Sequence, residues 1–454
     1  MIFDSAQLEC RFLSILIAVL SGLMISRRWK QGQLLTAAGG LHVNAFLMIG
    51  CGTFCYSLFD DFSERYSYLD ITEGFLHSGW YWLSGYILWC LYEVNQASPD
   101  SHQDNDWFMH TSQMFGIVLA SLSFLGYLVC QTEFASSGIG TIFVVLKGFL
   151  YPALILTILS VRTSKPSSVF AMALISLLTT YYALFSPWRS EIVITSGSVA
   201  IALLLRNRKW LLPAMLAMTF ALLILIPFAN YKKLHYDEYL NDPVQAFTGT
   251  LKMDMNERAE FVARFFSLRI DAGREMGYVQ HAIDKSLIEH RDGISYWEAA
   301  QQLVPRVLWS DKPSFNMIMN FVLPRQIGMV DWNDKGTSWG VSLYAELLWN
   351  FNPYHLIWFV PLIFMLLSHV DGFIDRTFIR RGSTFITHVV LFFQIFQIVG
   401  LVTQISYVLW AILVMKAAER VFYEAPSPSI MRREPGLQFN ASENSERIVV
   451  TGVE

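Results

Sequence analysis

The segment that decides the fold is FLSILIAVLSGLMISRRWK, residues 12–30, in which fifteen uncharged residues are followed by three basic ones. A membrane-spanning helix needs about 20 mostly apolar residues, and basic clusters mark the cytoplasmic ends of such helices. The chain of 454 residues is 54% hydrophobic and 15% charged, whereas soluble domains are about a quarter charged. These values predict a membrane protein.

Similar apolar runs recur along the chain. We predict eleven membrane-spanning segments, at residues 12–26, 34–59, 74–95, 111–130, 139–160, 168–185, 188–205, 210–229, 354–370, 384–400 and 403–420. If these segments alternate in direction, the basic clusters after the first, fifth, seventh and ninth all fall on one side. The positive-inside rule makes that side cytoplasmic, which places the N-terminus outside and the C-terminus inside. The predicted fold class is therefore an all-α polytopic membrane protein.

The spacing of the runs divides the chain into four regions. Residues 1–229 hold the first eight spans and residues 341–422 the last three. Between them, residues 230–340 form one long, partly helical outer loop that carries most of the polar residues of interest. Residues 423–454 contain APSPS and ENSER and are predicted to be a disordered cytoplasmic tail.

Within the long loop, residues 256–283 have helical periodicity. Four residues at i, i+3, i+7 and i+10 share a face away from the apolar stripe, namely Asp271, Arg274, Tyr278 and His281. This pattern predicts an amphipathic helix that lies on the outer leaflet or covers a cavity. The alternative is an ordinary surface helix with a solvated charged face. Gly273 and Gly277 are the positions at which the helix could break into two.

The sequence SPWRSEI, residues 186–192, has the features of a helix start at the outer membrane face. Ser186 is a natural N-cap and Pro187 a natural first helical residue. Arg189 follows in the first turn, where a cation is unfavourable because the helix dipole is positive there. The arrangement is explained if an anion such as phosphate docks at this end. The alternative is that Trp188 and Arg189 anchor the chain at the interface.

A second basic stretch lies between Pro305 and Pro313, which stiffen the backbone around it. Irregular backbone at membrane level is tolerated where it lines a polar cavity. Arg306 and Lys312 supply cationic donors, and Trp309 offers a flat face for a sugar ring. A further Pro-Arg pair ends at Arg325 in VLPRQIG. The alternative is a basic interfacial loop held by its tryptophan.

Other features narrow the class of function. The net charge of −4 gives no sign of a nucleic-acid partner. No metal-ligand spacing, nucleotide-binding glycine loop or nucleophile motif occurs, so we expect no cofactor. His42, inside an apolar run, is predicted to form an interhelical hydrogen bond. Charges gather in one outer loop rather than deep in several spans, which favours an enzyme over a transporter.

Two motifs carry a resemblance to a known family. VPRVLWSDKPS, residues 304–314, and GTSWGVSLYAELLWNF, residues 336–351, resemble the outer-loop signature of bacterial Wzy-type O-antigen and exopolysaccharide polymerases. The resemblance covers roughly residues 180–400 and includes Arg189 at the outer end of a middle span. Ser310 stands where that family usually has proline, and Asn352 where a glycine often follows Asn-Phe. These departures bear on which subfamily the chain resembles and on which substrate it would use.

The resemblance implies a glycosyltransferase of the bacterial inner membrane whose long loop is periplasmic. Its substrates are oligosaccharide repeat units linked to polyprenyl diphosphate, with a flippase and a chain-length regulator as partners in the lipid bilayer. The expected catalytic residues are Arg189, Arg274, Arg306, Lys312 and His281. The expected substrate-binding residues are Trp188, Arg269, Trp309, Asp311, Arg325 and Glu346.

Some alternatives stay open at the level of sequence. The reaction needs a general base for the attacking hydroxyl, and His281, Asp271 and Glu346 are all candidates. An O-antigen-ligase-like transferase shares the donor but uses another acceptor. A transporter of lipid-linked oligosaccharide and a non-catalytic assembly subunit are the alternatives from other classes.

Overall fold

A computed structural model of the chain describes residues 5–58, 68–95, 113–130, 146, 149–160, 195, 197–203, 212, 216, 219, 221–228, 243–269, 271–301, 309, 322–333, 340–378, 381–396, 409, 412–413 and 415–417. Regular structure within these residues is entirely helical, and they contain no strand. The predicted all-α class is therefore confirmed for this part of the chain. The predicted tail, residues 423–454, lies outside it.

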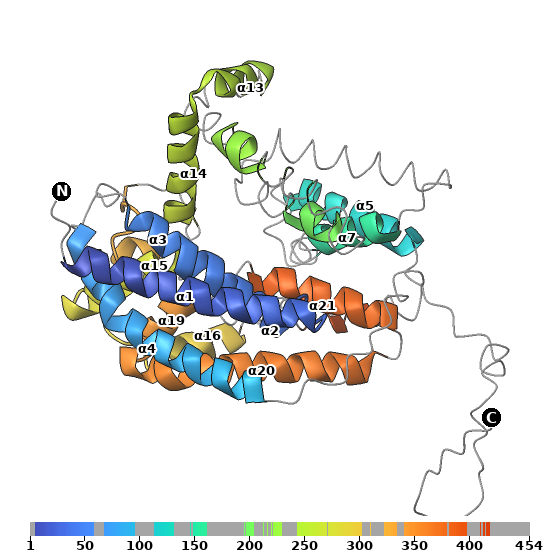
Figure 1. Ribbon diagram of the computed structural model, residues 1–454. Coiled ribbons are helices and arrows are strands. Elements are labelled where there is room, and N and C mark those ends of the chain that lie inside the picture. The colour runs from blue at the N-terminus through green and yellow to red at the C-terminus, as the bar shows by residue number, and fades with distance from the viewer. Residues whose placement is uncertain are drawn as a thin grey trace, which may run out of the picture.

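Long helical segments run alongside one another in a bundle (Figure 1). The N-terminal half contains α1 (Ser5–Lys30), α2 (Ala37–Asn44), the π-helical η1 (Ala45–Cys51), α3 (Gly52–Tyr56), α4 (Tyr68–Asn95), α5 (Gln113–Cys130), α7 (Leu150–Ser160) and the π-helical η5 (Ala221–Leu225). The C-terminal half contains α13 (Pro243–Lys252), α14 (Met255–Arg269), α15 (Ala272–Asp284), α16 (Ile294–Gln301), α18 (Leu323–Gln326), α19 (Leu343–Asn350), the short 3-10 helix η7 (Pro353–His355), α20 (Leu356–Thr377) and α21 (Arg381–Phe396).

Three helical segments in the described residues are long and apolar enough to cross a membrane. They are Ser5–Lys30, Ala37–Tyr56 and Pro353–Thr377, and each contains most or all of a predicted span. α5 and α7 also fall within predicted spans. The structure is thus that of a helical protein suited to a membrane, whereas the number of eleven spans stays a prediction.

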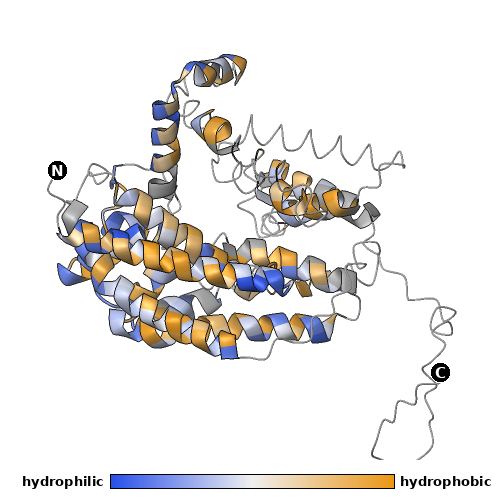
Figure 2. Cartoon of the chain, in the orientation of Figure 1, coloured by the Kyte–Doolittle hydropathy of each residue, from blue (hydrophilic) through white to orange (hydrophobic). Residues whose placement is uncertain are grey.

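The outer surface of α1 shows why this bundle suits a lipid environment. Its exposed large apolar side chains recur at helical spacing, at Leu8, Phe12, Ile15, Val19 and Leu23. Inward-facing Cys10, Ser14 and Ser21 of the same helix are small and buried. Figure 2 shows hydrophobic colour along most of α1 and α20. Since soluble proteins rarely expose an apolar patch of more than a few hundred Å², these faces fit contact with lipid.

α4 packs against α1, α15 and α20. Its Trp82 stacks on Tyr86 with ring centroids 5.0 Å apart and meets Tyr344 of α19 edge-on at 5.3 Å. Helix α20 comes close at Gly85, where an added Cβ would lie 2.6 Å from the carbonyl oxygen of Leu356. Aromatic packing and backbone contact together fix α4 against its neighbours.

Residues 37–56 form one helical segment made of α2, η1 and α3. Thr36 caps its start by accepting a hydrogen bond from the Gly39 backbone N–H. Its middle is π-helical, a rare geometry that often occurs at functional sites, and Gly50 there packs against Ala18 of α1. Thr36, just before this segment, contacts one of the two polar regions described below, and Thr53 within the segment contacts the other.

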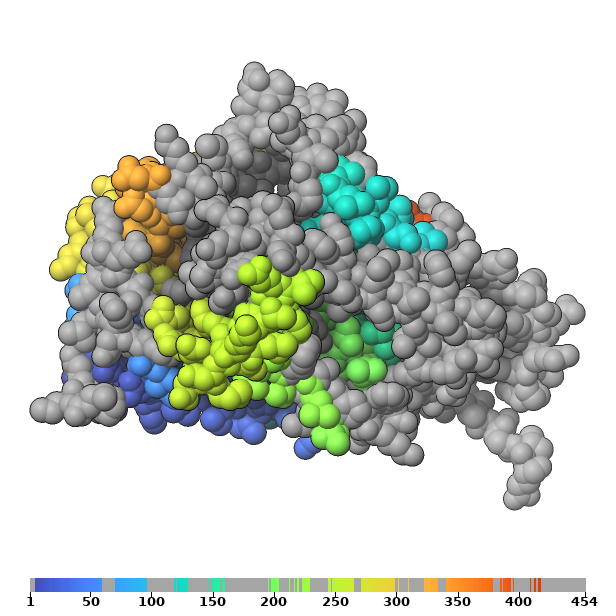
Figure 3. All heavy atoms as spheres, turned by 90° about the horizontal axis from the view of Figure 1, so that it is seen from above, coloured from blue at the N-terminus to red at the C-terminus, as the bar shows by residue number. Residues whose placement is uncertain are grey.

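α13 and α14 project from the bundle, with α14 packed against α3 (Figure 1), and Figure 3 shows their yellow-green atoms exposed in the view from above. Asp254 and Glu257 form a reciprocal capping box at the start of α14, with N–H to carboxylate distances of 2.7 and 3.2 Å. On its surface, Arg264 and Glu260 form an exposed ion pair of 2.7 Å. α14 therefore has the solvated charged face of an ordinary surface helix.

Candidate functional site

The stretch 256–283 is two helices and not one. α14 ends at Arg269, and α15 begins at Ala272 after its N-cap, Asp271. The break falls at Asp271 because its side chain accepts a hydrogen bond from the Arg274 backbone N–H, which starts a new helix. The prediction of a break at Gly273 or Gly277 is wrong.

α15 is buried in the bundle. Every residue from 271 to 282 is less than a tenth exposed, and the helix packs against α4, α19 and α3. The prediction that this helix lies on the outer leaflet is therefore wrong for α15. Ionisable side chains inside a helical bundle are costly, and they mark functional sites by default in membrane proteins.

The two glycines of GREMG, residues 273–277, allow this burial. A Cβ at Gly277 would overlap the carbonyl oxygen of Ile71 on α4, and one at Gly74 of α4 would lie 2.5 Å from the carbonyl oxygen of Gly277. A Cβ at Gly273 would overlap the hydroxyl of Thr53. This small-xxx-small pattern lets helix backbones approach closely, so the glycines serve packing.

Asp271 has an asymmetric set of contacts. Its Oδ1 accepts hydrogen bonds from the Thr53 hydroxyl at 2.7 Å and from the Arg274 backbone N–H at 2.8 Å. Its Oδ2 is buried and has no hydrogen-bond partner among the described residues. Burial raises the pKa of Asp271 to about 7, although the hydrogen bonds from Arg274 and Thr53 oppose that rise. Asp271 can therefore gain or lose a proton near neutral pH.

Arg274 places its guanidinium between two tyrosine rings. The carbon Cζ lies 5.8 Å from the ring centroid of Tyr56 on α3 and 5.4 Å from that of Tyr278 on α15. Both distances are within the range of a cation–π contact. The residue is 4% exposed. Its charge is thus held in a largely desolvated place, one turn from the carboxylate of Asp271.

Glu275 connects α15 to α19. Its Oε2 accepts a hydrogen bond of 2.6 Å from the backbone N–H of Ser342. Ser342 is the N-cap of α19, and its hydroxyl accepts a hydrogen bond from the Ala345 N–H. A carboxylate is favourable at the N-terminus of a helix. Glu275 therefore fixes the start of α19 against α15.

Glu346 lies on the next part of α19 and is fully buried. The Ser295 hydroxyl lies 3.3 Å from its Oε1. Asn350, one turn later, donates to the Ser295 hydroxyl at 2.6 Å and to the Glu346 carbonyl at 2.8 Å. The side chain of Glu346 is thus tied into a network with α16.

The remaining predicted residues fall into different surroundings. His281 is buried on α15, and Arg325 is buried on α18. Trp309 is 39% exposed. Arg269 is the last residue of α14, and its side chain lies outside the described part. The structure thus brings Arg274, His281 and Glu346 into two neighbouring helices, α15 and α19.

Five predicted residues lie outside the described residues: Trp188, Arg189, Arg306, Asp311 and Lys312. The catalytic and substrate-binding roles expected of them stay predictions.

Sequence reasoning missed several residues of this region: Thr53, Tyr56, Glu275, Ser295 and Ser342. Thr53 and Tyr56 lie in an apolar run where a hydroxyl gives little signal. Glu275 gave a usable signal. Burying an acid without a partner is unfavourable, so an acid next to Arg274 in the same helix indicates that a partner lies nearby.

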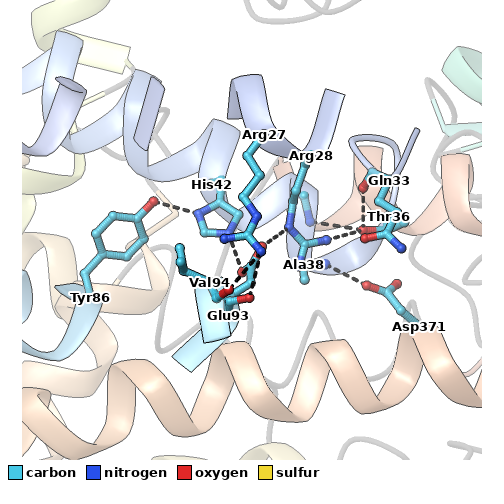
Figure 4. Close-up of polar contacts among 11 residues, drawn as sticks. Arg27, Arg28, Gln33, Thr36, Ala38, His42, Tyr86, Glu93, Val94 and Asp371 are labelled. Atoms are coloured by element: carbon cyan, nitrogen blue, oxygen red, sulfur yellow. Dashed lines mark hydrogen bonds and ion pairs between the residues drawn. The ribbon is translucent and has the colours of Figure 1, made fainter. Parts of the chain in front are cut away.

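A second polar cluster lies where α1 and α4 end and α2 begins (Figure 4). Glu93 of α4 has a partner on each oxygen: Arg28 of α1 at 2.7 Å and His42 of α2 at 3.0 Å. The other ring nitrogen of His42 lies 2.6 Å from the Tyr86 hydroxyl. The predicted interhelical bonding of His42 is therefore confirmed, and four ionisable or hydroxyl groups join three helices.

The same end of the bundle is tied to α20 and α21. The two oxygens of Asp371 accept hydrogen bonds from the Ala37 and Ala38 N–H groups at the start of α2, at 2.8 and 3.1 Å. His388 of α21 lies 3.3 Å from Asp371 and 2.8 Å from Asp375. Arg28, Glu93 and Asp371 lie at or just beyond the ends of predicted spans, so this cluster does not place charges deep within them.

The two clusters can perform different tasks. The cluster around Asp271 combines a carboxyl group that titrates near neutral pH with a desolvated guanidinium, so it can accept a proton and hold an anion. The cluster around Glu93 is internally paired. No group of three or more His, Cys, Asp or Glu among the described residues is arranged to hold a metal ion. No family model, curated protein or solved structure matches the chain.

Proposed function

We propose that the chain polymerises oligosaccharide repeat units linked to polyprenyl diphosphate, at the outer face of the bacterial inner membrane. The growing glycan passes from its diphosphate carrier to a hydroxyl of a new lipid-linked unit. The observation that carries the proposal is the burial of α15, which holds Asp271, Arg274 and His281 inside a bundle with lipid-suited outer faces. The resemblance of residues 304–314 and 336–351 to motifs of Wzy-type polymerases supports this choice of reaction and substrate.

The reaction releases a diphosphate, so negative charge develops on the leaving oxygen. A preorganised cation in a water-poor site stabilises such charge strongly. Arg274 meets this requirement because Tyr56 and Tyr278 hold its guanidinium and the residue is buried. Arg189, Arg306 and Lys312 are the further cations assigned to the diphosphate in this proposal.

The position of the site fits a substrate anchored in lipid. α15 meets the end of the 37–56 segment that carries Thr53 and Tyr56. The basic residues Arg27, Arg28 and Lys30 lie at the other end, where α1 meets Thr36. Under the positive-inside rule the basic end is cytoplasmic, which puts α15 outside. A flippase would deliver the units there, and a chain-length regulator would act on the product.

The test is deletion of the gene followed by complementation with variants. The deletion strain should carry glycans of a single repeat, and the wild-type gene should restore long chains. Arg274→Ala should lower polymerisation roughly 10²–10³-fold, since it removes one preorganised donor. Arg264→Ala, on the exposed face of α14, is the matched control and should restore long chains. Full activity of Arg274→Ala would contradict the role given to α15.

A second candidate, a transporter of lipid-linked oligosaccharide, is favoured by one observation. Ionisable side chains of α1, α2, α4 and α20 are buried together around Glu93 and Asp371, as in many transport proteins. The deletion strain separates these functions. Single repeats attached outside the membrane indicate a polymerase, long unattached chains a ligase, and units retained inside a transporter.

A further inference from the structure

The proposed reaction needs a group that accepts the proton of the attacking hydroxyl, and three side chains could do so by type. Glu346 is tied to Ser295 of α16, and Asn350 completes that network. Asp271 differs because both of its hydrogen bonds fall on Oδ1. Its Oδ2 is buried without a partner in the described part of the chain. A buried acceptor without a hydrogen bond destabilises the folded state, which points to a functional use of Oδ2.

We propose that Asp271 is the proton acceptor for the attacking sugar hydroxyl and that Thr53 is the residue that positions its carboxylate. The proposal rests on the proposed function. Thr53 and the first turn of α15 hold Oδ1, which leaves the lone pairs of Oδ2 for the substrate.

The acceptor oxygen forms a bond to the anomeric carbon while the bond from that carbon to the diphosphate oxygen breaks. The leaving diphosphate takes the electron pair of the broken bond, and the hydroxyl proton passes to Oδ2 of Asp271. The proton then leaves to water or to the released diphosphate, which restores the carboxylate. Arg274, one turn away, is placed to stabilise the diphosphate as it leaves.

The surroundings of Asp271 set its proton affinity. Arg274 and Glu275 act on it from α15, and the titratable groups Cys10 of α1 and Cys55 of α3 interact with its charge. Burial outweighs the hydrogen bonds and raises the pKa of Asp271 to about 7. A general base is most effective when its pKa lies near the working pH. Activity should therefore fall as the pH drops below about 7.

A structural role for Asp271 as the helix N-cap can be separated from a chemical one. Asn and Ser cap helices about as well as Asp, but neither accepts a proton at neutral pH. With the purified full chain and the lipid-linked unit extracted from the deletion strain, Asp271→Asn and Asp271→Ser should each lower the rate roughly 10²–10⁴-fold. Asp284→Asn, a half-exposed acid on the same helix, is the control and should leave the rate unchanged.

The role of Thr53 has its own readout. Its hydrogen bond favours the charged carboxylate, so removing it should raise the pKa of Asp271. Thr53→Val should move the acidic limb of the pH–rate profile upward by about one pH unit, whereas Thr53→Ser should leave the limb in place. Difference infrared spectra of wild type against Asp271→Asn should also show a carboxyl group titrating near pH 7, without any substrate.

The outcomes are distinguishable. If the wild type polymerises and Asp271→Asn does too, the assignment of Asp271 is overturned while the proposed function stands. If the acidic limb does not move in Thr53→Val, the positioning role is overturned. A wild type that forms no polymer overturns the proposed function together with this inference. An infrared difference without a titration near pH 7 also refutes the assignment of Asp271.

Discussion

The partly buried Glu93 and the buried Asp271 lie toward opposite ends of the bundle, and their oxygens are paired differently. Each oxygen of Glu93 has a cationic or imidazole partner, at 2.7 and 3.0 Å. Both hydrogen bonds of Asp271 fall on one oxygen, and the other has no partner among the described residues. An acid whose two oxygens are both paired, such as Glu93, joins helices. An acid with one unpaired oxygen, such as Asp271, keeps a reactive atom, and leaving that oxygen without a partner destabilises the fold.

The largest loss of stability is expected when the paired cluster around Glu93 is broken. Arg28→Ala would leave the partly buried Glu93 with His42 as its remaining partner. The loss of one partner of a fully buried pair costs about 3–5 kcal/mol, so a loss toward the lower end of that range is expected. Arg27→Ala is the matched control, because Arg27 donates only to the backbone carbonyls of Glu93 and Val94. Denaturant unfolding in detergent measures both variants. Equal stabilities would show that the Arg28–Glu93 pair does not hold this end together.

A smaller effect is expected from the helix contact that buries α15. Gly277→Ala places a Cβ against the Ile71 carbonyl oxygen, and overpacking of this kind typically costs about 1–3 kcal/mol. Gly197→Ala is the control, since nothing lies within 4 Å of an added Cβ there. This variant should be neutral or slightly stabilising. If the two variants melt at the same temperature, the close contact between α4 and α15 is contradicted.

The smallest effect concerns the pH dependence of stability. Burial raises the pKa of Asp271 from 3.8 to about 7, so the folded state holds its proton more tightly than the unfolded state. That contribution is present below the unfolded pKa and is lost as the pH rises through about 7. The wild type should therefore lose stability relative to Asp271→Asn as the pH is raised from 4 to 8. A difference that stays constant over this range would mean that Asp271 does not titrate in the folded protein.

Local patterns in the sequence predicted the helices well. The run of residues 12–26 became α1, because an apolar stretch of that length can satisfy its backbone and side chains only as a buried or lipid-facing helix. The helical period of 256–283 was also correct. Its break at Asp271 was missed because the N-cap competes with helix continuation through one side-chain hydrogen bond.

The polar clusters could not be predicted in the same way. Glu93 lies 65 residues from Arg28 and 51 from His42, and Thr53 lies 218 residues from Asp271. Periodicity reports which face of one helix is apolar, but it carries no information on which helix supplies the partner. The burial of α15 had a signal, however, since its two glycines at i and i+4 are a helix-packing pattern.

We propose that the end of the bundle around α15 joins lipid-linked repeat units. The most direct test is incubation of the purified chain with the lipid-linked unit extracted from the deletion strain, followed by separation of the products by length. We expect a ladder of products in whole multiples of the repeat for the wild type, and none for Arg274→Ala. A wild type that leaves every unit single, while moving the lipid-linked unit across the membrane of reconstituted vesicles, would contradict the proposal.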